Sequence, residues 1–122
     1  MFNYTLYENL LEEIEIPRVG ITSRPLYQGD KVRAVIFGFA ENEEMTEHTA
    51  SSPAIVQVLE GECIFTFDQD PRTMTPGSWA IMDAKMPHSI QATKPLKFLL
   101  HLLKDNHNLH FFLTKNGNLA RF

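Results

Sequence analysis

Cysteine is almost missing from this sequence, because Cys63 is the only one among 122 residues. A single cysteine excludes an internal disulfide and is typical of a protein in a reducing cytoplasm. Long apolar runs are missing as well. The longest covers residues 98–103 and contains a histidine, whereas a membrane-crossing helix needs ~18 apolar residues. The first residues carry no basic segment followed by an apolar one, so no secretory signal is predicted. We therefore expect a cytoplasmic protein that does not contact a membrane.

Positive charge is also scarce. The chain has 11 Lys and Arg residues against 15 Asp and Glu residues, which gives a formal net charge of -4. The basic residues form no stripe that would neutralise a phosphate backbone, so we expect no nucleic-acid partner. No nucleophile elbow, phosphate-binding loop or glycine-rich dinucleotide turn is present either.

Helical periodicity is confined to the N-terminus. The apolar residues that share one helical face there are Tyr4, Leu6, Leu10, Leu11 and Ile14. Pro17 ends the pattern, since proline cannot continue a helix. The sequence thus predicts a short helix of about two to three turns within residues 1–17. We expect it to cap the rest of the domain or a partner subunit.

Strand patterns follow Gly20. Short edge strands are predicted around Pro25, because proline is tolerated at a sheet edge and not in its centre. The longer predicted strands cover residues 31–40, 54–59, 63–67, 78–82, 89–92, 97–103 and 109–113, with 54–59 and 63–67 forming a hairpin. Residues 41–47, 68–74, 83–87 and 116–118 are predicted as loops or turns. Short strands with frequent turns indicate an all-β sandwich or barrel, and the length of the chain fits one domain over 1–122.

Two glycine–histidine patterns then stand out. Gly77 and His88 lie eleven residues apart, and His48 is followed at a distance by the turn glycine Gly61. Over residues 30–103 this arrangement resembles the two motifs of the cupin superfamily, in small RmlC-like members. The interval from Gly38 to His48 is longer than in that family. Asp83 and Lys85 stand where proline and glycine are usual in the second motif.

The resemblance implies a cupin-type double-stranded β-helix, or jelly-roll barrel, with a short N-terminal helix. It divides the chain into an N-terminal helical cap (1–17), the barrel motifs (30–103) and a C-terminal tail (104–122). Metal-binding cupins use two histidines and a glutamate from the first motif and one histidine from the second. Here His48 and His88 remain, whereas Ala50 and Ala54 fill the other two positions and cannot bind a metal.

A third metal ligand would have to come from elsewhere. His101 is the best candidate, because it interrupts an apolar strand and an imidazole there needs partners for its nitrogens. Strand alternation places it on the same face as Leu99 and Leu103, but leaves open which face looks into the barrel. The alternative is a buried histidine bound to the backbone or facing a partner subunit. Other oxygen donors near the motif strands are Glu44, Glu47, Gln57 and Gln91, while His107 and His110 in the tail are interpreted as solvated.

Two functions of the site remain open on these observations, besides that of a structural or regulatory partner protein that works as a dimer. One is a binding protein that holds a small molecule in its barrel, with or without a divalent ion (Zn, Ni, Mn or Fe) on His48, His88 and His101. The other is a metal-dependent cupin enzyme of the dioxygenase or isomerase type, for which no catalytic residue can be assigned. The two motif histidines are equally explained as a polar pair bound to water or to each other. We also expect a homodimer, formed through sheet edges.

The remaining apolar residues are interpreted as core. The aromatic residues at strand spacing are predicted to fill the barrel rather than to form a ligand cage: Phe37, Phe39, Phe65, Phe67 and Trp79. Cys63 begins a strand without a second cysteine nearby, so it is interpreted as a small core residue and not as a nucleophile.

Overall fold

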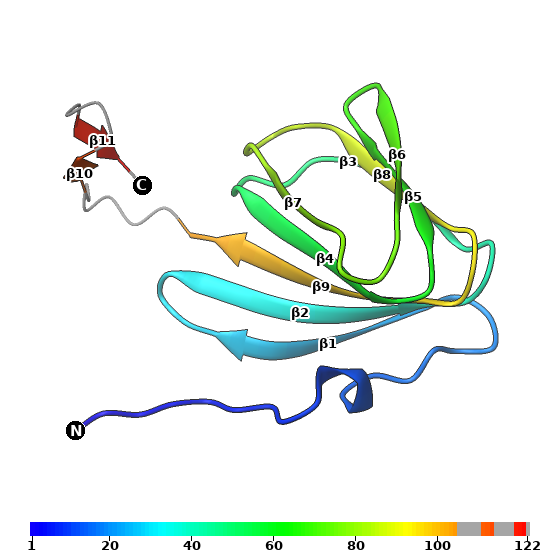
Figure 1. Cartoon of the computed structure of the whole chain (residues 1–122), viewed down its shortest axis with the longest axis horizontal. Helices are drawn as coiled ribbons and strands as arrows, with labels where there is room; N and C mark the ends of the chain where they lie inside the picture. The colour runs from blue at the N-terminus through cyan, green and yellow to red at the C-terminus, as the bar shows by residue number, and fades with distance from the viewer. Residues whose placement is uncertain (105–110, 114–118, 122) are drawn as a thin grey trace.

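The chain folds into two antiparallel β-sheets, as a computed structural model shows (Figure 1). The structure describes residues 1–104, 111–113 and 119–121. The five-stranded sheet has the order β1-β2-β9-β4-β7, and the four-stranded sheet has the order β3-β8-β5-β6. The strands of the first are β1 (Ile21–Gln28), β2 (Val32–Phe39), β9 (Leu96–Leu103), β4 (Ala54–Glu60) and β7 (Trp79–Met82). Those of the second are β3 (Glu44–His48), β8 (His88–Ala92), β5 (Cys63–Phe67) and β6 (Asp70–Met74). The prediction of an all-β fold is confirmed.

The main core lies between the two sheets. Alternate residues of each strand point inward, so that Phe39 and Phe98 from one sheet meet Phe65 from the other. Phe39 also packs edge to face against Phe98, with ring centres 5.4 Å apart. Cys63 is buried in this core, where desolvation raises the pKa of its thiol to about 11. Its interpretation as a core residue agrees with this position.

Trp79 departs from the predicted core. Its side chain is 56% exposed, although Phe39 and Phe65 are buried and Phe37 and Phe67 are half-buried against the core. The reason is alternation on the edge strand β7, where Ala80 packs against the core and Trp79 therefore faces outward.

The predicted helix over residues 1–17 is wrong, because only one 3-10 turn forms there, η1 (Leu10–Glu12). The Asn9 side chain caps this turn by accepting a hydrogen bond from the backbone N–H of Leu11, 3.1 Å away. Residues on either side of the turn run extended along the outer face of the five-stranded sheet (Figure 1). A helix this short is marginal in water, and the apolar sheet face favours the extended segment instead. We call residues 1–16 the N-terminal arm.

Several strand predictions also need correction. Residues 44–48 and 70–74 form the strands β3 and β6, although their polar sequences predicted loops. The predicted hairpin of residues 54–59 with 63–67 does not form, since β4 pairs with β7 and β9 while β5 pairs with β6 and β8. Gly61, at a φ of 84°, lies in the turn that carries the chain from one sheet to the other. The turn predicted at 116–118 lies outside the described residues, as do residues 109–110. Residues 111–113 form β10 (Phe111–Leu113), which pairs with β11 (Leu119–Arg121).

No helix in the described part of the chain is long and apolar enough to cross a membrane.

Candidate functional site

The two motif histidines face each other in the four-stranded sheet. His48 ends β3 and His88 begins β8, and the two residues are direct partners in the register of these antiparallel strands. Their ring centres lie 4.2 Å apart, with the ring planes inclined by 60°. Positions forty residues apart in the sequence thus converge on one point, as the motif spacing predicted.

Both imidazoles are anchored by the same kind of hydrogen bond. The Nδ1 atom of His48 lies 2.8 Å from the carbonyl oxygen of Thr46, and that of His88 lies 2.9 Å from the carbonyl oxygen of Met86. Because a carbonyl oxygen only accepts, each Nδ1 must donate its proton. In the neutral ring the Nε2 atom then carries a free lone pair. Neither Nε2 atom is thus committed to the backbone by the bond that anchors its ring.

His88 is held uncharged by its surroundings. It is 7% exposed, and its ring lies parallel to that of Phe65, with centres 5.8 Å apart. Desolvation by burial lowers the pKa of His88 below its usual 6.5; the bond to the Met86 carbonyl opposes this shift and the nearby His48 adds to it. At neutral pH the His88 ring is accordingly an acceptor at Nε2 and not a cation.

The loop before His88 is held by backbone hydrogen bonds on both sides and contains one residue in the left-handed conformation. Lys85, at the family's glycine position, has a φ of 67°, a left-handed conformation that glycine adopts without strain. Its backbone N–H donates to the carbonyl of Ala50, 2.7 Å away, which ties the loop to the segment after His48. On the other side, the N–H of Asp68 donates to the Pro87 carbonyl at 2.7 Å. These bonds fix the loop that carries His88.

The residues around the pair supply only part of a metal site. Ala54 is 3% exposed and packs in the core, so its position offers a methyl group where the family has a carboxylate. Glu44, Glu47 and Gln91 are exposed. Among the described residues, no three His, Cys, Asp or Glu side chains gather closely enough to hold one ion. The donor set fits two ligands to a cation and falls short of the three that catalytic sites use.

His101 lies on the other side of the five-stranded sheet from this pair. In β9 it is opposite Ala34 of β2 and Ile55 of β4. Ala34 and Leu99 belong to a second apolar cluster, which lies on the outer face beneath the N-terminal arm. The structure therefore does not bring His101 together with His48 and His88. His107 and His110 lie outside the described residues.

The sequence matches the profile of one protein family, the cupin domain, over residues 35–102. That segment covers more than half of the chain and contains both His48 and His88. None of the curated proteins matches the chain.

Solved structures agree with the family match. A conserved protein of unknown function from Streptococcus pyogenes superposes with a TM-score of 0.76 at 25% identity, covering 86% of this chain and 92% of its own. A cupin superfamily protein from Desulfitobacterium hafniense gives 0.76 at 26% identity, covering 86% and 99%. A cupin 2 conserved barrel domain protein from Leptotrichia buccalis gives 0.74 at 32% identity, covering 79% of this chain and 47% of that one. The resemblance drawn from the two motifs, and the fold it implied, are confirmed: the chain belongs to the cupin family.

Proposed function

We propose that this cupin binds a small polar molecule at the His48–His88 pair, and that the pair also accepts a divalent cation as an exchangeable ligand. One observation carries the proposal: both Nδ1 atoms are committed to backbone carbonyls, which leaves the Nε2 atoms free on two rings whose centres lie 4.2 Å apart. A histidine whose second nitrogen donates to a carbonyl is the usual arrangement of a metal-binding imidazole.

The chemistry of the pair also selects among organic ligands. An Nε2 lone pair that faces no backbone partner favours a molecule that donates hydrogen bonds, such as one with hydroxyl or amino groups. The half-buried Phe67 is the register partner of His88 and stacks on the buried Phe65 with ring centres 4.4 Å apart, so one apolar ring borders the pair. A ligand with donor groups on one side and a carbon skeleton on the other fits both features.

The metal-dependent enzyme is the weaker proposal. A metal ion that performs catalysis usually has three fixed protein ligands and an open position, and the described residues provide two ligands here. Elemental analysis of protein purified without a chelator separates the two functions. A full equivalent of bound Fe, Mn, Ni or Zn would favour the enzyme, whereas a trace that is lost on gel filtration favours the exchangeable site.

The binding site itself is tested by titration with Zn²⁺, followed by NMR of the histidine side-chain nitrogens. We expect the Nε2 signals of His48 and His88 to shift in parallel while their Nδ1 signals stay near the protonated position. His48→Ala and His88→Ala should each weaken the response, and the double variant should abolish it. His101→Ala is the matched control, because it removes a histidine from the opposite face and should leave the titration unchanged. Equal shifts at all three histidines would contradict a specific pair.

The expected homodimer has support on the outer face of the five-stranded sheet. Trp79 and Ile81 are each 56% exposed and project from the same side of the edge strand β7. Apolar surface of this kind is typical of an interface. We propose that two copies associate there; light scattering at micromolar concentration should give a dimer for the unchanged chain and a monomer for Ile81→Lys. A monomeric unchanged chain would exclude it.

A further inference from the structure

A cavity of about 420 Å³ lies between the N-terminal arm and the outer face of the five-stranded sheet. It is on the opposite side of that sheet from the His48–His88 pair. Its floor is apolar and comes from three neighbouring strands, with Leu26 from β1, Ala34 from β2 and Leu99 from β9. A volume of this size is within the range of pockets that enclose small organic ligands.

Aromatic side chains form the walls. Tyr4 and Tyr7 come from the arm, and Tyr27 comes from the far end of β1. No Asp, Glu, Lys or Arg side chain is among the lining residues, although 21% of the chain is charged. An ion would therefore lose its hydration in this cavity without gaining a partner of opposite charge. The lining favours an uncharged, flat molecule that stacks on tyrosine rings.

His101 provides the polar group on the sheet side of the cavity, and Asn3 and Thr5 are the uncharged polar residues of the arm in the lining. His101 reaches the cavity from β9, and no hydrogen bond joins its ring to the part of the chain that the structure describes. Burial, with no compensating partner, lowers the pKa of His101 below 6.5. The ring is thus neutral at pH 7 and offers one donor and one acceptor to a bound molecule.

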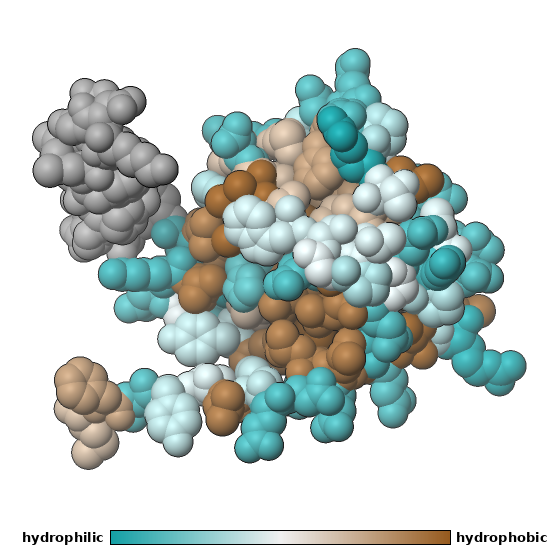
Figure 2. All heavy atoms as spheres, viewed as in Figure 1, coloured by the Kyte–Doolittle hydropathy of each residue, from teal (hydrophilic) through white to brown (hydrophobic). Residues whose placement is uncertain are grey.

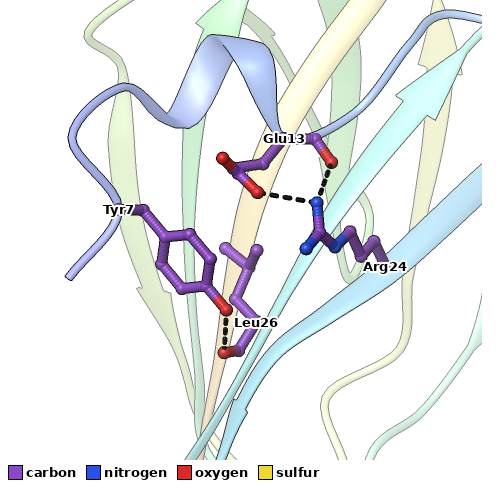
Figure 3. A network of polar contacts seen from close by, with 4 residues as sticks. All are labelled: Tyr7, Glu13, Arg24 and Leu26. Atoms are coloured by element: carbon purple, nitrogen blue, oxygen red, sulfur yellow. Dashed lines mark hydrogen bonds and ion pairs between the residues drawn. The ribbon is translucent and has the colours of Figure 1, made fainter. Parts of the chain in front are cut away.

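The arm that forms one wall is fixed to the sheet by several polar contacts. The hydroxyl of Tyr7 donates to the Leu26 carbonyl at 2.5 Å, and Arg24 bonds the Glu13 carboxylate at 2.6 Å (Figure 3). Further along, the ammonium of Lys97 donates to the Leu11 carbonyl at 2.7 Å. Figure 2 shows hydrophobic surface of the body directly above the arm. These contacts fix the arm from Tyr7 to Glu13, so the part of the wall that Tyr7 and Leu10 form is part of the folded structure.

We propose that this cavity is a second ligand site, which takes an uncharged aromatic molecule bearing one hydroxyl or carbonyl group that hydrogen-bonds to His101. The aromatic body lies between the tyrosines and above the aliphatic floor, and the single polar group reaches the imidazole. The site is independent of the proposed function, because the two histidine positions lie on opposite sides of one sheet.

The test uses three matched probes: 2-naphthol, naphthalene and naphthalene-2-sulfonate. Binding to the full chain is followed by backbone amide NMR, which also locates the site. We expect 2-naphthol to bind most tightly, with shifts at Tyr7, Ala34, Leu99 and His101, and the sulfonate to bind most weakly. His101→Leu should weaken 2-naphthol about three- to tenfold, the effect of one hydrogen bond, and leave naphthalene unchanged.

Two further variants change the floor and the wall of the cavity. Ala34→Phe fills the floor and should abolish binding of both neutral probes, with circular dichroism checking that the variant folds. Tyr4→Ala removes a wall residue that is 89% exposed, so it should weaken both neutral probes without affecting folding. The double variant His48→Ala/His88→Ala is the control and should bind 2-naphthol normally. The proposal would be overturned if the shifts mapped to another surface. It would also be overturned if His101→Leu and the unchanged chain bound 2-naphthol with equal affinity.

Discussion

Gly61→Ala should be among the most destabilising single substitutions in this chain, because the turn at Gly61 leaves no room for a side chain. A Cβ atom built at Gly61 would lie 1.8 Å from the carbonyl oxygen of Pro95, 2.8 Å from its carbonyl carbon and 3.0 Å from the Cα of Leu96. All three are backbone atoms, which cannot rotate away. The N–H groups of Thr93 and Lys94 both donate to the Glu62 carbonyl, so the two segments are bound together at this point.

Gly20 provides a matched control. It has the same φ of 84°, but a Cβ atom there meets nothing within 4 Å. Gly20→Ala should therefore cost only the left-handed strain of about 1–2 kcal/mol. Gly61→Ala adds the displacement of packed backbone, for which overpacking costs of about 1–3 kcal/mol are the nearest comparison, giving about 2–5 kcal/mol in total. At about 4 °C per kcal/mol, Tm should fall by about 4–8 °C for the control and about 8–20 °C for Gly61→Ala.

Thermal and urea unfolding of the three proteins, followed by circular dichroism, measure the difference directly. The substitutions are chemically identical and share one backbone angle, so the excess at Gly61 reports the contact with Pro95. If both variants lost the same stability, the close approach of the turn to residues 95–96 would be incorrect, and with it the account of how the chain passes between the sheets.

Lys85→Gly should raise the free energy of unfolding by about 1 kcal/mol, because it removes the left-handed strain at this position. Lys85→Ala keeps the Cβ atom and should give no such increase, so the urea unfolding midpoints of the two variants should differ. Stability should fall as the pH drops below about 6.5, because the lowered pKa values of His88 and His101 mean that the unfolded chain binds more protons there; His88→Asn should make this fall smaller than in the unchanged chain, as urea unfolding at a series of pH values would show. Tyr7→Phe removes the hydroxyl that binds the Leu26 carbonyl and should speed amide exchange in the arm while leaving β8 protected; equal exchange in both proteins would mean that this bond does not hold the arm.

The sequence predicted best the strands that are buried on at least one face. The motif spacing singled out His48 and His88, whose ring centres lie 4.2 Å apart in the structure. The buried strands β2, β4 and β9 carry β-branched and aromatic residues with regular alternation, so they were recognisable. The sequence did not predict β3 and β6. Both lie at the edges of their sheet, and their mostly exposed polar side chains are typical of loops.

Strand pairing was harder to predict than strand location. The tight turn around Gly61 suggested a local hairpin, yet β4 and β5 belong to different sheets. Proximity in sequence favours a hairpin, whereas the jelly-roll arrangement pairs β4 with β9, whose register partners lie 37 to 48 residues apart. The N-terminal helix was predicted wrongly for a related reason. Its apolar side chains do follow a helical period, but they pack on the outer face of the sheet instead, where Tyr7, Leu10 and Ile14 contact the second apolar cluster.

The position of His101 on the outer face of the sheet could have been predicted from strand alternation. Residues 97, 99, 101 and 103 share one face of β9, and the residue at 97 is a lysine. A charged lysine cannot point into an apolar interior without a partner, so Lys97 alone assigns this face to the outside, and His101 with it. The structure agrees, since the Lys97 ammonium reaches the Leu11 carbonyl of the arm. The same argument explains why a histidine is tolerated among leucines: the face it occupies is covered by the arm incompletely, and the cavity left between them is where its nitrogens can find a partner.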